Sequence, residues 1–168
     1  HITVTSLDPE LSRRLEPRAS LPASRLDAIA KLTQAGIPTG VVIAPIIPGL
    51  TDHEIPAILR AARQAGASRA SYSIIRLPHA VKEIFVSWLE EHVPGSAEKI
   101  LDRIRDLRGG ALHSSRFGER MRGGGFWSDQ IQTLFSRCRA REEYDEGHFE
   151  YNVNAFRRPP VPQLSLDL

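Results

Sequence analysis

The sequence predicts an α/β fold in which parallel strands alternate with helices. The tripeptide Gln-Ala-Gly occurs at 34–36 and again at 64–66, each time between a helical pattern and an apolar run. The interval of about 30 residues is the length of one strand–helix unit. Residues 41–44 form an apolar run without polar alternation, as expected for a strand covered on both faces. Two such units in series imply a parallel sheet with right-handed crossovers.

The first half of the chain contains alternating predicted strands and helices. Strands are expected at residues 2–6, 41–44 and 70–75, and helices at 20–36 and 55–66. β-branched residues fill the first strand, and Leu26 and Ile29 lie on the apolar stripe of the first long helix. A further turn of helix is expected near residues 9–14. We assign residues 1–78 to these strand–helix units.

A loop containing proline and glycine follows the second strand. Pro45 and Pro48 are expected to end the strand, because proline cannot donate to a ladder, and Gly49 allows a tight turn. Thr51 and Glu54 have the spacing of a capping box, which predicts that they cap the next helix. Ligands in α/β folds bind where a buried parallel strand runs into such a loop.

The second half of the chain changes to consecutive helical patterns, and we assign residues 79–142 to a helical extension. Apolar stripes of helical period cover residues 81–89, 100–107 and 127–138. Residues 112–125 have weak periodicity and three consecutive glycines, which indicates a loop. Residues 143–168 are first acidic and then rich in proline, so we expect an extended or disordered tail.

The composition is that of an ordinary soluble globular domain. The 168 residues are 41% hydrophobic and 25% charged, and the net charge of +2 is too small to imply a polyanionic partner. The single cysteine, Cys138, excludes an internal disulfide and favours a reducing compartment. The sequence shows neither an apolar run that could span a membrane nor a signal-peptide pattern, so we predict a cytoplasmic protein without a membrane partner.

Residues 45–52, Pro-Ile-Ile-Pro-Gly-Leu-Thr-Asp, resemble the adenine-side motif GxIxGxxE that follows the fifth strand of radical S-adenosylmethionine (SAM) enzymes. Ile47 and Gly49 match the motif, whereas Pro45 replaces its first glycine and Asp52 replaces its glutamate. Flanking segments strengthen the resemblance by their order and spacing: 6–10, 15–18, 25–26, 35–37 and 76–78. The chain is most similar to radical SAM proteins near spore photoproduct lyase, in an uncharacterised bacterial branch often labelled DNA repair photolyase.

This resemblance implies that the chain is the C-terminal part of an incomplete, partial TIM-type parallel α/β barrel with additional C-terminal helices. It also implies SAM and a [4Fe–4S] cluster as cofactors of the full-length protein, which would cleave SAM reductively and use a 5′-deoxyadenosyl radical on an unknown substrate. The family's cluster ligands lie in a CxxxCxxC loop, and this sequence has only Cys138. The half that bears the cluster would therefore precede His1.

By the same resemblance, the cofactor-binding residues are Ser6, Arg25, Ile47 and Gly49. Ile47 would present an apolar face to the adenine, Gly49 would let the backbone approach it, and Ser6 would hydrogen-bond the ribose or methionine part of SAM. The alternatives are a plain strand–helix loop for Ile47 and Gly49 and a turn cap for Ser6. The catalytic residues are unknown, and the sequence assigns no residue to a metal.

A guanidinium group near the first strand would complete the SAM site by binding the methionyl carboxylate. Arg25 or Arg18 could take this role, because arginine binds carboxylates with two parallel hydrogen bonds. The alternatives are exposure to solvent and an internal ion pair with Glu16.

A second hypothesis is a self-contained α/β binding module without a cluster. Arg116, Arg120 and Arg122 surround the glycine-rich segment, and Phe126 and Trp127 follow it. Basic residues interleaved with aromatic ones can bind single-stranded nucleic acid. The simpler alternative is a charged loop with Trp127 in the core.

The first predicted strand also bears on partners. A parallel strand at residues 2–6 needs a neighbour on each side, and a bare sheet edge pairs with other chains. We therefore expect this edge to pair with an N-terminal half of the same protein or with a second copy of the chain.

Overall fold

The computed structural model describes residues 1–112, 123–147, 153–155 and 157, and the statements below concern this part of the chain. The strands are β1 (Ile2–Val4), β2 (Gly40–Ile46) and β3 (Arg69–Ile74). The α-helices are α1 (Pro9–Leu15), α2 (Pro22–Gln34), α3 (Ile55–Gln64), α4 (Val81–His92), α5 (Ala97–Leu107) and α6 (Gly125–Arg141). Short 3-10 helices are η1 (Asp52–Glu54), η2 (Pro94–Ser96) and η3 (Val153–Ala155).

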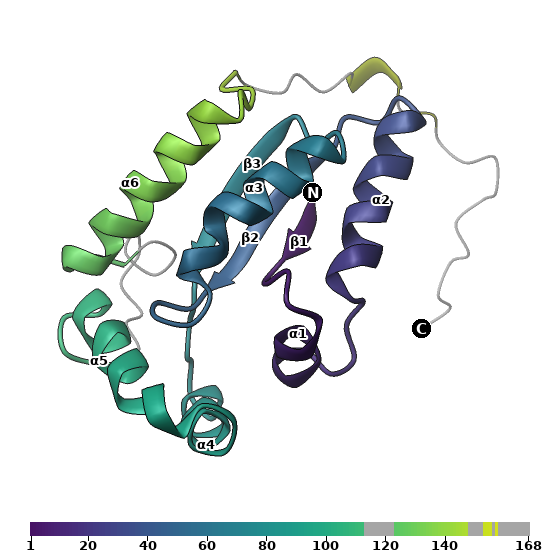
Figure 1. Ribbon diagram of the computed structural model, residues 1–168. Helices are drawn as coiled ribbons and strands as arrows, with labels where there is room; N and C mark the ends of the chain where they lie inside the picture. The colour runs from purple at the N-terminus through teal and green to yellow at the C-terminus, as the bar shows by residue number, and fades with distance from the viewer. Residues whose placement is uncertain (113–122, 148–152, 156, 158–168) are drawn as a thin grey trace, which may run out of the picture.

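The strands form a parallel sheet in the order β1-β2-β3. Ile2 pairs with Val41 across the first ladder, and Gly40 pairs with Arg69 across the second. Figure 1 shows α3 in front of the sheet, with α2 beside β1 and α6 on the opposite side. The α/β class and the parallel sheet predicted from the sequence are therefore confirmed.

The predicted partial TIM-type barrel is wrong. The described residues form a small three-stranded parallel sheet with six α-helices, and the sheet is open, with β1 and β3 at its edges. Closing a barrel requires enough staggered strands to bring the two edges together, and three strands do not provide them. The expected pairing of the β1 edge with an N-terminal half or a second copy stays a prediction.

The ends of the elements correct two local expectations. Pro45 does not end the second strand, because β2 continues to Ile46 with a shift of register between Ile43 and Ile46. Proline is tolerated at such irregularities because the ladder does not need its missing donor there. Gly36 and Gly66 follow α2 and α3 with φ of 74° and 101°, the left-handed conformation expected of a helix-ending glycine.

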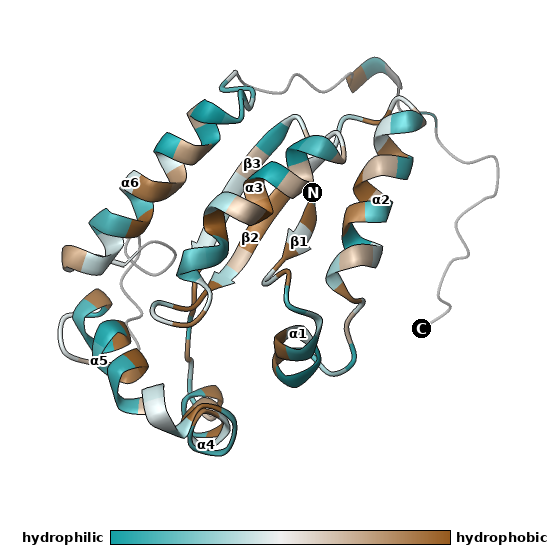
Figure 2. Cartoon of the chain, in the orientation of Figure 1, coloured by the Kyte–Doolittle hydropathy of each residue, from teal (hydrophilic) through white to brown (hydrophobic). Residues whose placement is uncertain are grey.

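The hydrophobic core lies between the sheet and the helices. Ile43 and Ile46 of β2 pack with Ile58 and Leu59 of α3, and Ile104 of α5 belongs to the same buried cluster. Figure 2 shows hydrophobic residues along β1 and β2, while the surrounding helices carry both hydrophobic and hydrophilic residues. Burying each such side chain contributes about 1.5–3 kcal/mol, so this cluster fixes the carboxyl end of β2.

Some expectations fall outside the described part of the chain. These are residues 113–122 of the predicted loop and most of the predicted tail. The division into residues 1–78, 79–142 and 143–168 stays a prediction. Among the described helices, none combines the length and the apolar character needed to cross a membrane.

Candidate functional site at the carboxyl end of the sheet

The carboxyl ends of β1 and β2 meet at one edge of the molecule because the strands are parallel. Ser6 lies just beyond β1, and the loop 47–51 follows β2 and leads into η1. This arrangement places the predicted residues Ser6, Ile47 and Gly49 at the same end of the sheet. It is the position at which open α/β sheets bind ligands.

Glu54, at the end of η1, connects the segment that follows β2 to the segment that follows β1. Its carboxylate accepts a hydrogen bond of 2.7 Å from Ser6 Oγ through Oε1 and another of 2.7 Å from the Leu7 amide through Oε2. The Ser6 hydroxyl also accepts a hydrogen bond of 3.0 Å from the Asp8 amide. Ser6 is only 1% exposed, so its hydroxyl is part of this internal network.

The predicted capping box is wrong, because both of its side chains have other partners. The hydroxyl of Thr51 accepts a hydrogen bond of 2.9 Å from the Ile47 amide, and Glu54 is bound to the end of β1. Neither η1 nor α3 has a side-chain cap. The two residues therefore hold the loop in place and fasten it to the neighbouring strand.

The loop after β2 is stabilised from within. Gly49 adopts φ of 86°, and its amide donates to Asp52 Oδ1 at 2.9 Å. Ile47 is 1% exposed and belongs to the hydrophobic core. The side chain of Ile47, predicted to face adenine, therefore packs into the hydrophobic core in this conformation.

Arg103 of α5 covers the outer side of this loop. Its guanidinium lies 3.9 Å from the centre of the Trp127 ring, and its Nη1 lies 3.7 Å from Asp52 Oδ2. A Cβ atom added to Gly49 would come within 2.8 Å of the same Nη1. The close approach that a glycine permits at this position is thus made by an arginine of the same chain. Trp127 packs against the core, as the simpler sequence interpretation expects.

Arg25 is held by the chain as well. Its Nη2 lies 2.9 Å from Glu16 Oε2, its Nη1 donates to the Thr3 carbonyl at 3.0 Å, and its Nε donates to the Ser20 carbonyl at 2.8 Å. This is the internal pair with Glu16 that the sequence left open as an alternative. The cofactor role of Arg25 stays a prediction.

An open groove of about 540 Å³ lies beside the loop, on the side of α1. Its lining residues are Asp8, Glu10, Leu11, Arg14, Leu50, His53, Glu54 and Val93. Three carboxylates, one guanidinium, one imidazole and apolar surface from two leucines and a valine therefore face the same space. Ser6 and Ile47 are buried and do not line the groove, whereas Leu50 and Glu54 do.

Three residues of this site were not predicted from the sequence. Glu54 was interpreted as a helix cap, although its spacing from Thr51 gave a signal that it was structurally engaged. Arg14 could have been found from the expected helical turn at 9–14, which follows the strand end closely. Arg103 had no signal in the sequence, because its contact with Gly49 joins segments more than fifty positions apart.

A metal cluster has no ligand set in the described residues. Cys138 is buried on α6, and the described part of the chain brings together no group of three or more histidine, cysteine or acidic side chains suited to a metal ion. Arg116, Arg120 and Arg122, the basic residues considered for nucleic acid, lie outside the described residues.

Comparison with known proteins finds relatives described only as uncharacterized. The chain is 30% identical over 102 residues to a protein of Mycobacterium tuberculosis strain H37Rv, an alignment that covers 60% of this chain and 29% of that protein. A protein of Mycobacterium bovis gives the same values. A protein of Acidianus two-tailed virus is 34% identical over 47 residues, which are 28% of this chain and 16% of the viral protein.

The aligned part of the chain thus spans less than a third of the length of the mycobacterial relatives that it matches. No protein-family model matches the chain, and no solved structure matches it at a significant level.

Proposed function

We propose that the natural protein containing this chain is a radical SAM enzyme, and that the chain supplies part of the SAM and substrate side of its site. The observation that carries the proposal is the position of residues 45–52. This segment resembles the family's adenine-side motif and lies where β2 ends, beside the open groove. The mycobacterial and viral relatives are described only as uncharacterized, so they support no particular activity.

The groove has the size and the chemistry for a ligand such as SAM. Its volume of about 540 Å³ lies within the range of roughly 300–1,000 Å³ that is usual for small-molecule pockets. SAM carries a carboxylate, an ammonium group, a sulfonium centre and two ribose hydroxyls. Arg14 suits the carboxylate, while Asp8 and Glu54 suit the cationic groups and the hydroxyls. Leu50 offers apolar surface to the adenine in place of the buried Ile47.

The cluster does not fit this chain, because Cys138 is a single, buried thiol remote from the groove residues in sequence. In an enzyme of this type a reduced cluster supplies one electron to break the bond between sulfur and C5′ of SAM. We assign no part of that step to this chain. Its residues would bind and orient SAM at the edge of the sheet.

Equilibrium dialysis of radiolabelled SAM against the chain tests this assignment. We expect saturable binding, weakened about tenfold by Arg14→Gln through loss of a charge-assisted hydrogen bond. Arg13→Gln is the control on the same helix: Arg13 does not line the groove but pairs with Glu10, which does, so a smaller loss of binding than in Arg14→Gln is expected. Ile47→Asp would be a poor probe, because a charge at a core position would unfold the chain.

The natural protein provides the second measurement. After anaerobic reconstitution with iron and sulfide, it should release 5′-deoxyadenosine from SAM when a reductant is added. Absence of SAM binding together with absence of 5′-deoxyadenosine would refute the proposal. Equal loss of SAM binding in Arg13→Gln and Arg14→Gln would show that SAM does not bind in the groove.

A further inference from the structure

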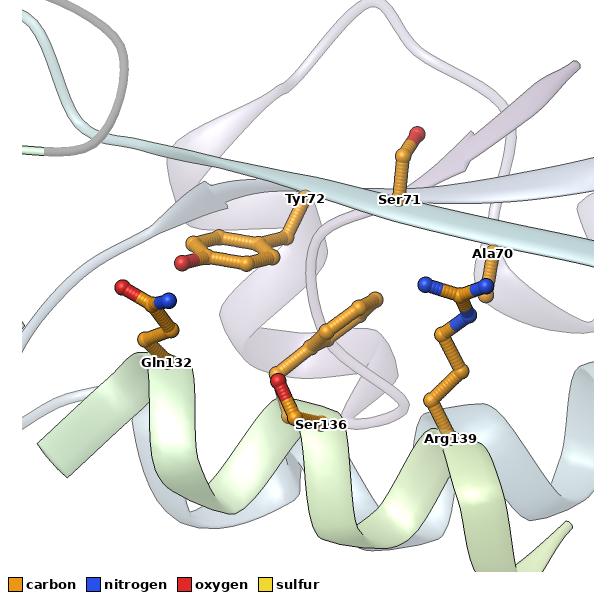
Figure 3. A pocket seen from close by; sticks show the side chains of 7 residues that line it. Ala70, Ser71, Tyr72, Gln132, Ser136 and Arg139 are labelled. Carbon is orange, nitrogen blue, oxygen red and sulfur yellow. The ribbon is translucent and has the colours of Figure 1, made fainter. Parts of the chain in front are cut away.

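A second groove lies between β3 and α6, away from the loop after β2. It encloses about 190 Å³ and is lined by Ala70, Ser71, Tyr72, Gln132, Phe135, Ser136 and Arg139. Figure 3 shows Gln132, Ser136 and Arg139 rising from α6 toward the strand, with Tyr72 reaching down from β3. The groove therefore has a helical wall of polar side chains that face a strand.

Aromatic rings close one side of this groove. The rings of Tyr72 and Phe135 lie with their centres 4.6 Å apart and tilted by 49°. Such an offset pair is a favourable contact between a strand and a helix. The contact between Tyr72 and Phe135 therefore holds this side of the groove in place.

Arg139 is the charged residue of the lining, and its hydrogen bonding is incomplete. Its Nη2 donates to the Asp145 carbonyl at 3.2 Å, and the same atom lies 3.6 Å from Glu146 Oε1. Its Nε is buried and has no hydrogen-bond partner. The carboxylate of Glu146 is 80% exposed, so solvent weakens its attraction for the guanidinium.

An unpartnered buried N–H of a charged group is costly. The buried group loses its hydrogen bond to water without gaining another, and native structures satisfy the large majority of buried polar atoms with protein, water or a bound ligand. Within the groove lining there is no carboxylate to serve as the acceptor. The lining offers only neutral hydroxyl and amide oxygens as acceptors, and none of them is bonded to this Nε.

We propose that the groove between β3 and α6 binds a small ligand through a carboxylate or phosphate group held by Arg139. An oxyanion in the groove would meet the part of the Arg139 side chain that is not buried, and arginine is suited to planar, two-point recognition of such groups. The Ser136 hydroxyl and the Gln132 amide are further donors on the same wall.

The size of the groove limits the ligand. At about 190 Å³ it is smaller than the roughly 300 Å³ at which pockets for drug-sized molecules begin. It suits inorganic phosphate, a short carboxylic acid or the anionic end group of a larger molecule. This site is separate from the SAM groove and does not depend on the function proposed above.

Titration of the 168-residue chain with inorganic phosphate, and separately with succinate, tests the proposal. Isothermal calorimetry at constant ionic strength should give one saturable site for at least one of the two anions. Arg139→Gln should weaken that binding at least about tenfold, as expected for loss of a charge-assisted hydrogen bond. Phosphate alone or succinate alone would identify the preferred anionic group.

Arg137→Gln is the matched control, because it removes the same charge from an exposed position of α6 that does not line this groove. It should change binding less than about twofold, since exposed charges contribute little. Ser136→Ala, also at an exposed position, tests the site without risk to the fold and should weaken binding. The proposal is overturned if neither anion binds at 50 mM (roughly the limit for weak sites), or if both arginine variants weaken binding equally.

Discussion

Removing the carboxylate of Glu54 should destabilise the chain more than its half-buried position suggests. Glu54 accepts hydrogen bonds from Ser6 Oγ and from the Leu7 amide, both at 2.7 Å, and Ser6 is 1% exposed. A hydrogen bond to a charged group contributes about 1.5–3 kcal/mol, and a buried donor left without its acceptor carries its desolvation cost. With the lower value for each bond, because Glu54 is half-buried, Glu54→Ala should cost about 3 kcal/mol.

The isosteric substitution separates charge from shape. Glu54→Gln keeps one acceptor oxygen but turns an NH2 group toward a donor, so it should cost about 1.5 kcal/mol. Urea unfolding followed by circular dichroism measures this as a fall in the midpoint of about 1 M, for a slope of about 1.5 kcal/mol/M. Glu98→Gln is the control, since Glu98 pairs with Arg105 at a position where its side chain is 75% exposed. Its effect should stay below about 0.5 kcal/mol. Equal stability of the two glutamine variants would refute the anchoring role of Glu54.

Three further predictions follow from the structure. Gly49→Ala should lower the free energy of unfolding by about 1–2 kcal/mol, because Gly49 has φ of 86° and the added Cβ would meet Arg103. Gly95→Ala is the control: its added Cβ would have no atom within 4 Å, so its effect in the same urea assay should be near zero. Burial raises the pKa of Tyr144, so the unfolded state ionises first and stability should fall as pH rises above about 10; Tyr144→Phe should lessen this alkaline loss in thermal unfolding. The chain should stay colourless after anaerobic reconstitution with iron and sulfide, because Cys138 alone cannot hold a [4Fe–4S] cluster; bound iron at about four atoms per chain would contradict this.

Patterns that depend on neighbouring residues were predictable from the sequence. The repeated Gln-Ala-Gly segments correctly placed the ends of α2 and α3, because glycine is favoured where a helix ends in a left-handed conformation. The apolar run 41–44 lies inside β2, and the stripe of Ile58 and Leu59 is buried in the core. These features need only local periodicity and the chemistry of single residues.

Patterns that depend on distant contacts were not predictable in the same way. The spacing of Thr51 and Glu54 is that of a capping box, but the competing partners, the Ile47 amide and the end of β1, are set by tertiary structure. The contact of Arg103 with the loop requires the position of α5, which no local pattern provides. The barrel expectation came from the resemblance of residues 45–52 and their flanking segments, and a short motif does not determine how many strands the sheet contains.

The contact between Arg25 and β1 affects how readily another strand can add to this edge of the sheet. An edge strand with unpaired carbonyls is a template on which further chains can stack as cross-β fibrils. Arg25 Nη1 occupies the carbonyl of Thr3 at 3.0 Å, and its charge is retained at the edge by Glu16. An incoming strand would have to remove this guanidinium and bring its own backbone against a fixed positive charge. Any partner that pairs with this edge, whether an N-terminal half, a second copy or a fibril, must therefore first displace Arg25 from the Thr3 carbonyl.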